Sequence, residues 1–407
     1  MSIHLQPGDA GYDDNRKALN PALDPYPAEV VLAETTADVR AAVLSARRRG
    51  LAFAVQATGH GTHVAHDGAL LLRTHRMASV LVDPDRRIAK VGPGARWGDV
   101  LAAAAPFGLA PLSGSSPDVG VTGYTVGGGL GWLARRHGLA ADSVQRARIV
   151  TADGELVTAD ADRNADLFWA VRGGGGSFGV VTDLEFRLYP VSRVYAGAVT
   201  FGRERAAETL ACYRRWIEQA PDELSTALLL TRDGRLVVKA MYSGDDLDRG
   251  RRLLAPLWQA AGPPLADTMQ VVDYAGAAMG GTFARTFDQV RALSDDLVHA
   301  LVNEPDTTVE IRHWGGRIAR DTGAAAHRDA PLSVILDTVP SARVTDALAR
   351  DGIGSSFLNF LPDPSRVETA FTPANWAALR RVKAAYDPGA FFSAGLAVPP
   401  AALQASA

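Results

Sequence analysis

The sequence predicts a large α+β protein with an antiparallel sheet in its second half. The first half alternates short strands and helices around clusters of glycine, and the second half places pairs of strands between long helices. At 407 residues, the chain is long enough for about two to three domains. Hydrophobic residues make up 47% and charged residues 21%, a balance that is typical of folded globular proteins and excludes a disordered chain.

Charge and cysteine content narrow the class of protein further. A net charge of −3 argues against a nucleic-acid binder, whose footprint would be an excess of basic residues. The N-terminus lacks a signal-peptide pattern, and no apolar run is long enough to cross a membrane. We therefore expect a soluble, cytoplasmic protein with neither nucleic acid nor membrane as a partner. The single cysteine, Cys212, excludes an internal disulfide and a cysteine-rich zinc site.

The first half begins with a clear helix. Thr36 is a suitable cap, apolar residues from Val39 to Ala46 recur at helical spacing, and Gly50 ends the helix. A buried strand is expected at residues 51–56. The remaining elements are strands at residues 70–73, 80–82 and 88–91, a helix at 96–105, a hairpin of 147–151 with 155–159, and a strand at 179–189.

The second half reads as a sheet with helices on one face. Strands are expected at residues 194–201, 225–231, 235–242, 308–314 and 332–338. Helices are expected at residues 204–219, 245–261 and 284–302, and again near the C-terminus at 375–385.

Glycine clusters are the feature of the first half that suggests function. The segment Gly174 to Gly179 satisfies G-x-G-x-x-G, but a strand follows it where a Rossmann dinucleotide site needs a helix. A classical Rossmann site is therefore disfavoured. Glycine turns that present backbone amides still bind a pyrophosphate without a lysine, whereas the alternative is a set of tight turns packed together.

Ordered motifs occur along the chain at residues 55–61 (VQATGHG), 115–123 (SSPDVGVTG), 127–131 (GGGLG), 137–142 (HGLAAD), 166–175 (DLFWAVRGGG), 178–181 (FGVV), 310–316 (EIRHWGG) and 386–388 (YDP). In this order they resemble the berberine bridge enzyme-like flavoprotein oxidases, which have the vanillyl-alcohol oxidase type of FAD-binding fold. The resemblance implies an FAD-binding domain of two α/β subdomains formed from both chain ends, residues 1–190 and 357–407. It places a substrate domain, an antiparallel sheet covered by helices, at residues 191–356.

The resemblance also implies which residues hold FAD. The cofactor-binding residues expected from the matching motifs are Thr58, Gly59, His60, Gly61, Thr62, Ser115, Ser116, Val119, Gly120, Gly123, Gly127, Gly128, Gly129, Gly131, Trp132, Gly175, Gly176 and Val180. Relatives join the histidine at the position of His60 to the flavin covalently. Relatives with a double linkage carry a cysteine where this chain has Ser116, so a single linkage is expected.

Two features of the same region leave alternatives open. Gln56 replaces an arginine of the family pattern, which removes a positive charge expected near the pyrophosphate. His60, His63 and His66 with Asp67 have a spacing that could also be interpreted as a metal site. We expect no metal, because spacing of this kind on a glycine-flanked loop has low specificity.

The reaction implied by the resemblance is oxidation of a CH–OH, CH–NH or activated C–H centre of a small molecule. Molecular oxygen is the expected acceptor, which gives hydrogen peroxide, and a small residue at Val119 is expected to leave oxygen room to reach the flavin. A secondary metabolite is the favoured substrate, with a sugar or oligosaccharide as an alternative. A non-redox cyclase that keeps flavin as a scaffold and a binding protein with vestigial motifs are two further hypotheses. The oligomeric state stays open.

The proton acceptor for this reaction is not the usual one. Many relatives use a tyrosine in a Tyr-x-Asn-Tyr/Phe strand motif, and residues 357–360 here read Phe-Leu-Asn-Phe. In the strand around residue 311, alternation puts Glu310 and Arg312 on one face and His313 on the other. We predict Glu310 as the base and Arg312 as its orienting or substrate-anchoring partner, with His313 as the next candidate. A structural ion pair is the alternative interpretation.

Overall fold

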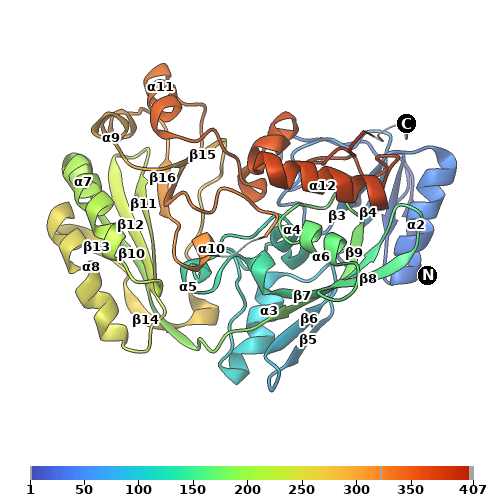
Figure 1. Cartoon of the computed structure of the whole chain (residues 1–407), viewed down its shortest axis with the longest axis horizontal. Coiled ribbons are helices and arrows are strands. Elements are labelled where there is room, and N and C mark those ends of the chain that lie inside the picture. The colour runs from blue at the N-terminus through green and yellow to red at the C-terminus, as the bar shows by residue number, and fades with distance from the viewer. Residues whose placement is uncertain (1, 321–322, 403–407) are drawn as a thin grey trace.

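The computed structural model describes residues 2–320 and 323–402. Within these residues the chain forms three β-sheets, two from residues 3–187 and one from residues 193–336 (Figure 1). This arrangement confirms the predicted α+β class. No helix among the described residues is long and apolar enough to cross a membrane.

The first sheet comes from the N-terminal 73 residues and has the strand order β1-β2-β4-β3. Its strands are β1 (Ile3–Leu5), β2 (Glu29–Leu32), β3 (Phe53–Gln56) and β4 (Leu70–Arg73), and the helices of this region are α1 (Tyr12–Arg16) and α2 (Thr36–Arg49). Strands β2, β4 and β3 are parallel, because α2 makes the crossover between β2 and β3. The cap of α2 is Thr35 and not Thr36, since the Thr35 side chain accepts the Asp38 amide.

The second sheet is antiparallel, with the order β5-β6-β9-β7-β8. Its strands are β5 (Val80–Asp83), β6 (Ile88–Val91), β7 (Val144–Val150), β8 (Leu156–Asp160) and β9 (Val180–Arg187). The accompanying helices are α3 (Trp97–Ala104), α4 (Val121–Val126), α5 (Ala134–His137) and α6 (Ala165–Val171). The predicted hairpin is confirmed, with Ala147 opposite Ala159. A strand, β9, follows the glycine cluster at 173–179, so the structure agrees that this is not a Rossmann motif.

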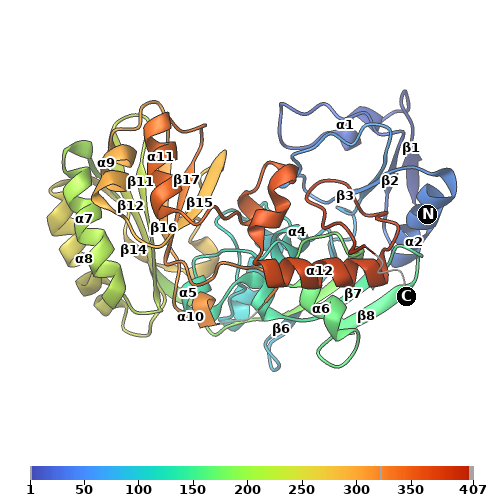
Figure 2. The same cartoon turned by 45° about the horizontal axis from the view of Figure 1, so that its top comes forward.

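The third sheet is antiparallel, and helices cover one of its faces (Figure 2). Its strands are β10 (Arg193–Gly202), β11 (Leu224–Leu230), β12 (Arg235–Tyr242), β13 (Pro264–Asp267), β14 (Gln270–Asp273), β15 (Thr286–Val290), β16 (Val309–His313) and β17 (Leu332–Leu336). The covering helices are α7 (Ala206–Trp216), α8 (Leu247–Ala261), α9 (Asp295–Val302) and α11 (Ala342–Asp351). Alternate residues of β11, such as Leu228 and Leu230, pack against these helices, whereas Ala227 and Leu229 face the second sheet and its loops.

The helix predicted at residues 284–302 is wrong in its first half. Residues Thr286–Val290 form β15, which pairs with β17 at one edge of the third sheet, and only Asp295–Val302 are helical. Ser294 caps that helix by accepting the Leu297 amide. Pairing with β17 gives the backbone amides and carbonyls of this segment the hydrogen bonds that they would otherwise make within a helix. Tertiary contacts therefore override the local preference for a helix.

The C-terminal part of the chain returns to the second sheet. Helix α12 (Pro373–Tyr386) lies beside α6, and the short helix α10 (Arg317–Arg320) lies beside α5 (Figures 1 and 2). One apolar core contains Phe178 beside β9, Leu379 of α12 and Leu229 of the third sheet. This shared core holds the third sheet against the glycine-rich loops, and so brings the parts of the site together.

Candidate cofactor and substrate site

His60 lies in the loop of residues 57–63, which we call the histidine loop and which follows strand β3. Its Nδ1 lies 3.0 Å from the Thr58 hydroxyl oxygen. Partial burial lowers the pKa of His60 below its usual value; Asp118 opposes this shift and Arg96 adds to it. The imidazole is therefore largely neutral at pH 7, which is the form that acts as a nucleophile.

A second loop, residues 114–120, packs against the histidine loop and is called the serine loop. A Cβ added at Gly120 would lie 3.3 Å from the Thr58 hydroxyl oxygen, so the two loops are in close contact at this glycine. Beside them, Arg96 and Asp118 form an ion pair at 3.8 Å. The structure therefore brings together Thr58, His60, Ser116, Val119 and Gly120, which were predicted from separate motifs.

The glycine loop, residues 127–131, sits beside the serine loop. Gly129 has φ of 78°, and its amide donates to the Asn359 side-chain oxygen at 2.8 Å. A Cβ at Gly131 would collide with the Ser113 carbonyl oxygen, so only glycine allows this approach. Next in sequence, the Trp132 indole nitrogen donates to the Ser115 hydroxyl at 3.0 Å.

The cluster at residues 173–179 is tied to the same region. The Gly175 amide donates to the Val126 carbonyl at 2.9 Å, which joins this cluster to the end of α4. Gly176 is exposed, whereas Val180 is buried in the first residue of β9. Among the cofactor-binding residues predicted from sequence, Gly176 and Val180 have no contact in the structure that specifically supports a role in binding.

The loops have the properties that a diphosphate-bearing cofactor requires. No hydrogen bond within the described residues uses the backbone amides of His60, Gly61 or Ser116. Ideal Cβ positions at Gly61 in the histidine loop and at Gly123 in helix α4 meet open space, so both segments present bare backbone to a ligand. Free amides on glycine-rich turns bind anions, and the guanidinium of Arg96 adds a positive charge. The residues present therefore fit FAD.

Gln56 has a role that sequence did not reveal. Its buried side chain donates to the Lys17 carbonyl at 2.8 Å and accepts the Thr62 hydroxyl at 3.1 Å. Arg73 is the direct partner of Gln56 on the neighbouring strand and donates to the same carbonyl at 3.2 Å; burial lowers the pKa of Arg73 to about 10. The positive charge that Gln56 lacks is therefore present on β4, a neighbour that no local motif could indicate.

Glu310 and Arg312 lie on the face of the third sheet that is turned toward these loops. They alternate with Val309 and Ile311, which pack against the covering helices. Glu310 is 3% exposed and accepts the Thr282 hydroxyl at 2.7 Å; Arg312 is 5% exposed, with its Nη1 4.0 Å from the Glu310 carboxylate. Both predicted residues are thus buried at the boundary between the sheet and the loops.

Arg312 connects the sheet to the glycine loop. Its guanidinium carbon lies 4.7 Å from the centroid of the Trp132 ring, a cation–π contact. Because Trp132 also donates to Ser115, a continuous set of contacts runs from the serine loop to Glu310. The Nη2 of Arg312 is buried and has no hydrogen-bond partner among the described residues.

His313 is placed differently. Its Nε2 lies 2.8 Å from the guanidinium of Arg135 in α5, and burial together with this cation holds the pKa of His313 well below its usual value. Arg135 also donates to the carbonyls of Leu224 and Trp314. This contact set is that of a structural bridge between α5 and the third sheet, so the geometry favours Glu310 over His313 as a proton acceptor.

Residues 357–360 differ from the family motif in shape as well as in sequence. Leu358–Phe360 form a 3₁₀ turn and not a strand. Phe357 and Phe360 lie among Phe287 and Trp314, while Asn359 accepts the Gly129 amide and donates to the Tyr124 carbonyl. Asn359 therefore holds the glycine loop, and the two phenylalanines fill an aromatic cluster.

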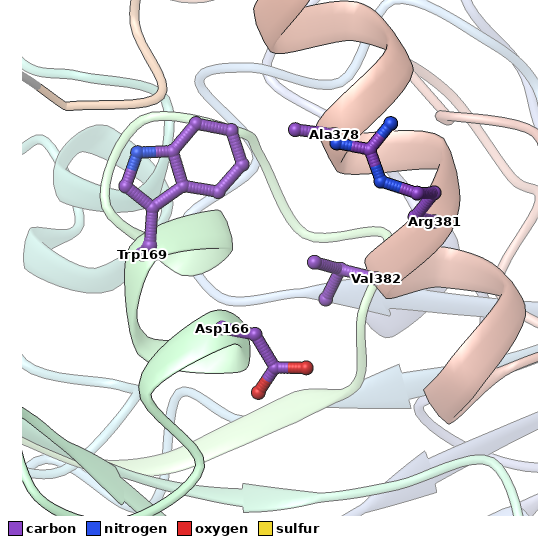
Figure 3. Close-up of a pocket in the computed structure, with 5 residues that line it drawn as sticks. All are labelled: Asp166, Trp169, Ala378, Arg381 and Val382. Atoms are coloured by element: carbon purple, nitrogen blue, oxygen red, sulfur yellow. The ribbon is translucent and has the colours of Figure 1, made fainter.

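Two other features do not belong to this site. A pocket of about 330 Å³ lies between α6 and α12 and is lined by Asp166, Trp169, Ala378, Arg381 and Val382 (Figure 3). None of these residues was predicted to bind the cofactor. Within the part of the chain that the structure describes, no three His, Cys, Asp or Glu side chains are grouped to hold a metal ion. His63 and His66 thus form no such group with His60.

Comparison with known proteins identifies the ligand class. Residues 27–160 match the family described as FAD binding domain. An uncharacterised FAD-linked oxidoreductase of Bacillus subtilis, YgaK, is 26% identical over 96% of this chain and 95% of its own length. The (R)-6-hydroxynicotine oxidase of Paenarthrobacter nicotinovorans is 35% identical over 48% of this chain and 44% of its own.

Solved structures share the whole fold. A 6-hydroxy-D-nicotine oxidase from Arthrobacter nicotinovorans superposes with a TM-score of 0.89 at 25% identity, covering 98% of both chains. A berberine bridge enzyme-like protein of Physcomitrella patens gives 0.87 at 22%, covering 96% and 95%. A glucooligosaccharide oxidase from Acremonium strictum, whose FAD is 6-S-cysteinyl and 8α-N1-histidyl, gives 0.85 at 24%, covering 98% of both.

These similarities confirm the predicted resemblance and the fold class. The relatives are FAD-linked oxidoreductases and oxidases, and the matched domain binds FAD, so the enzyme class and the cofactor are confirmed as well.

Proposed function

We propose that this FAD-linked oxidoreductase is an oxidase that removes hydride from a CH–OH, CH–NH or activated C–H centre and uses oxygen as its acceptor. The observation that carries the proposal is the buried Glu310 and Arg312 pair, which faces loops whose free amides suit the cofactor. Bound FAD would supply the hydride acceptor and the route for electrons to oxygen, yielding hydrogen peroxide. The chain would supply orientation, exclusion of water and a place for the substrate proton.

Glu310 is the proposed proton acceptor. Its carboxylate accepts one hydrogen bond from Thr282 and lies near one cation, Arg312, so it is held in place with a free acceptor position. Loss of hydride from a CH–OH or CH–NH centre releases a proton from the oxygen or nitrogen, and a positioned carboxylate takes it. The phenylalanines at 357 and 360 offer no such group.

A single covalent bond to His60 is the proposed mode of attachment. The neutral imidazole of His60 suits addition to an electrophilic carbon, whereas the hydroxyl of Ser116 is a far weaker nucleophile than a thiolate. Cys212 lies on α7, with its sulfur 4.0 Å from the Pro256 carbonyl on α8. That position is on the helix-covered side of the third sheet, away from the histidine and serine loops.

The substrate is proposed to be a small organic molecule, with a secondary metabolite favoured and a sugar or oligosaccharide as second candidate. The 6-hydroxynicotine oxidase and the glucooligosaccharide oxidase support small-molecule oxidation in general. The aromatic cluster of Phe287, Phe357 and Phe360 beside the site favours a substrate with apolar surface.

Anaerobic mixing with a panel of alcohols, amines and sugars tests the proposal. Bleaching of the visible flavin band by a substrate, followed by recovery of the band and peroxide formation when air is admitted, is the expected result. Product formation without bleaching would instead indicate a non-redox cyclase. A purified protein that carries flavin, bleaches with a substrate and fails to recover in air would contradict oxygen as the acceptor.

A further inference from the structure

The face of the third sheet that is turned toward the loops carries an excess of positive charge. Arg312 on β16 is the direct partner of Ala227 on β11, and Ala227 is the direct partner of Lys239 on β12. Residues in one such row project to the same face, with neighbouring strands about 4.8 Å apart. The methyl group of Ala227 separates the two cations, and Glu310 is the acidic residue beside Arg312.

Arg312 lacks a full set of partners. Its Nη2 is buried without an acceptor among the described residues, and its Nη1 is 4.0 Å from Glu310, which is longer than a hydrogen bond. A buried donor without an acceptor is costly, so native proteins seldom leave one unmatched. The planar guanidinium is pinned against Trp132 and presents its remaining donors in a fixed plane.

Lys239 completes the positive surface. The residue is half-buried as a whole, and its ammonium group has the Gly280 carbonyl at 3.5 Å, the limit of a hydrogen bond. Burial lowers the pKa of Lys239, with Glu310 raising it and Arg312 lowering it, so the three groups are within electrostatic reach of one another. The neighbouring side chains on this face, Leu229 and Met241, are apolar and cannot satisfy either cation.

We infer that the substrate of this enzyme carries a carboxylate, and that Arg312 and Lys239 bind it between the third sheet and the loops that this face is turned toward. Arg312 would donate two hydrogen bonds to one carboxylate, the arrangement for which a guanidinium is best suited. Glu310 next to it would then lie beside the carbon to be oxidised. The inference rests on the proposed function, because it assumes that substrate occupies this face.

Carboxylate and amide pairs of the same shape test the inference on the flavin-loaded enzyme. Acetate, benzoate and 3-phenylpropionate, each compared with its neutral amide, are titrated while the visible flavin spectrum is followed. We expect at least one carboxylate to perturb the spectrum and to bind about tenfold or more tightly than its amide, as the loss of charged hydrogen bonds implies. Binding of no carboxylate, or equal binding of carboxylate and amide, would overturn the inference.

Variants assign the effect to the two cations. Arg312→Met is expected to weaken the bound carboxylate about tenfold or more, Arg312→Lys to restore part of the affinity, and Lys239→Met to weaken it severalfold. Arg249→Met is the matched control, because Arg249 is exposed on α8. Flavin content and melting temperature show whether each variant folds. If Arg312→Met fails to fold, the carboxylate affinity of Arg312→Lys, which keeps the charge but not the planar guanidinium, tests the inference in its place.

Bound FAD is the alternative hydrogen-bond acceptor for the unpaired Nη2 of Arg312. If Arg312→Met changes the flavin spectrum and reduction potential without changing carboxylate affinity, Arg312 serves the cofactor and the inference is wrong. Failure of the proposed oxidase function has a different signature, since it would leave carboxylate binding intact while every substrate failed to bleach the flavin.

Discussion

The ammonium group of Lys383 and the carboxylate of Asp387 are hydrogen-bonded at 2.6 Å, and both side chains are 1% exposed. Lys383 also donates to the carbonyls of Ser177 and Phe392, while Asp387 accepts the amides of Phe391 and Phe392. The pair therefore joins helix α12 to the glycine cluster at 173–179 and to the C-terminal segment. The Tyr386-Asp387-Pro388 motif thus supports a glycine cluster that lies far from it in sequence.

Removing one partner of this pair should strongly destabilise the protein. Lys383→Met leaves a buried carboxylate without its cation, and such a loss costs about 3–5 kcal/mol of unfolding free energy. Denaturant unfolding followed by tryptophan fluorescence measures it. The double variant Lys383→Met with Asp387→Asn should lose less than the sum of the two single variants. Lys90→Met, which breaks a partly exposed pair with Asp183 at 3.6 Å, is the control and should cost at most about 1 kcal/mol. Equal losses in Lys383→Met and Lys90→Met would contradict this role.

His60 should be the only covalent attachment point of the flavin. Acid-denatured wild-type protein should stay yellow with the mass of one FAD, and peptide mapping should place it on the segment that contains His60. His60→Ala should release flavin on denaturation, whereas Ser116→Ala should leave the linkage unchanged because a hydroxyl does not form the second bond. Free flavin from the acid-denatured wild type would show that the linkage is absent.

Val119 should control access of oxygen to the reduced flavin. The side chain is half-buried in the serine loop, next to Gly120, and packs against the apolar core. Val119→Leu should slow reoxidation in stopped-flow experiments by about tenfold, equivalent to about 1.4 kcal/mol, while anaerobic reduction stays near the wild-type rate. Val119→Ala is the matched control and should reoxidise at least as fast as the wild type. Equal slowing of both half-reactions in Val119→Leu would contradict the prediction.

Glu310→Gln should slow anaerobic reduction of the flavin by substrate. The amide cannot accept the substrate proton, and general base catalysis contributes about 10²- to 10⁴-fold to a rate. Stopped-flow reduction over a range of pH values measures the effect, with Glu208→Gln on the exposed side of α7 as the control. A near-normal rate in Glu310→Gln across pH would remove Glu310 as the base, and His313→Gln would be the next variant to measure.

His137 should make the protein sensitive to acid. Its ring stacks on Tyr189 with 4.1 Å between centroids, and burial together with Arg136 lowers the pKa of His137 to about 4. The unfolded chain takes up this proton near pH 6.5 and the folded chain only near pH 4, so stability present above pH 6.5 is lost as the pH falls between these values.

His137→Phe keeps an aromatic ring against Tyr189 but removes the titrating group, so it should lose less stability between pH 6.5 and 4 than the wild type. Melting temperatures measured across this range test it. His299→Phe, a change at an exposed position of α9, should leave the wild-type pH dependence in place. If His137→Phe showed the same acid loss as the wild type, another group would have to be responsible.

Much of the secondary structure followed from local pattern. Strands β4, β6 and β12 have the bounds expected at residues 70–73, 88–91 and 235–242, because alternation and turn residues are properties of short segments. Residues 286–290 were expected to be helical, and their pairing with β17 depends on a strand more than 40 residues away. Local periodicity contains no information about such a partner.

For the site, sequence alone determined that Glu310 and Arg312 share one face of a strand and that glycines at 129 and 131 permit a tight loop. Those facts depend on backbone geometry over a few residues. Only the tertiary structure decided which face meets the loops, that Arg135 takes His313 as its partner across 178 residues, and that Arg73 places a positive charge beside Gln56. The burial and pairing of charged groups depend on contacts between segments that are distant in sequence. These contacts form only when the sheets and loops pack and exclude water.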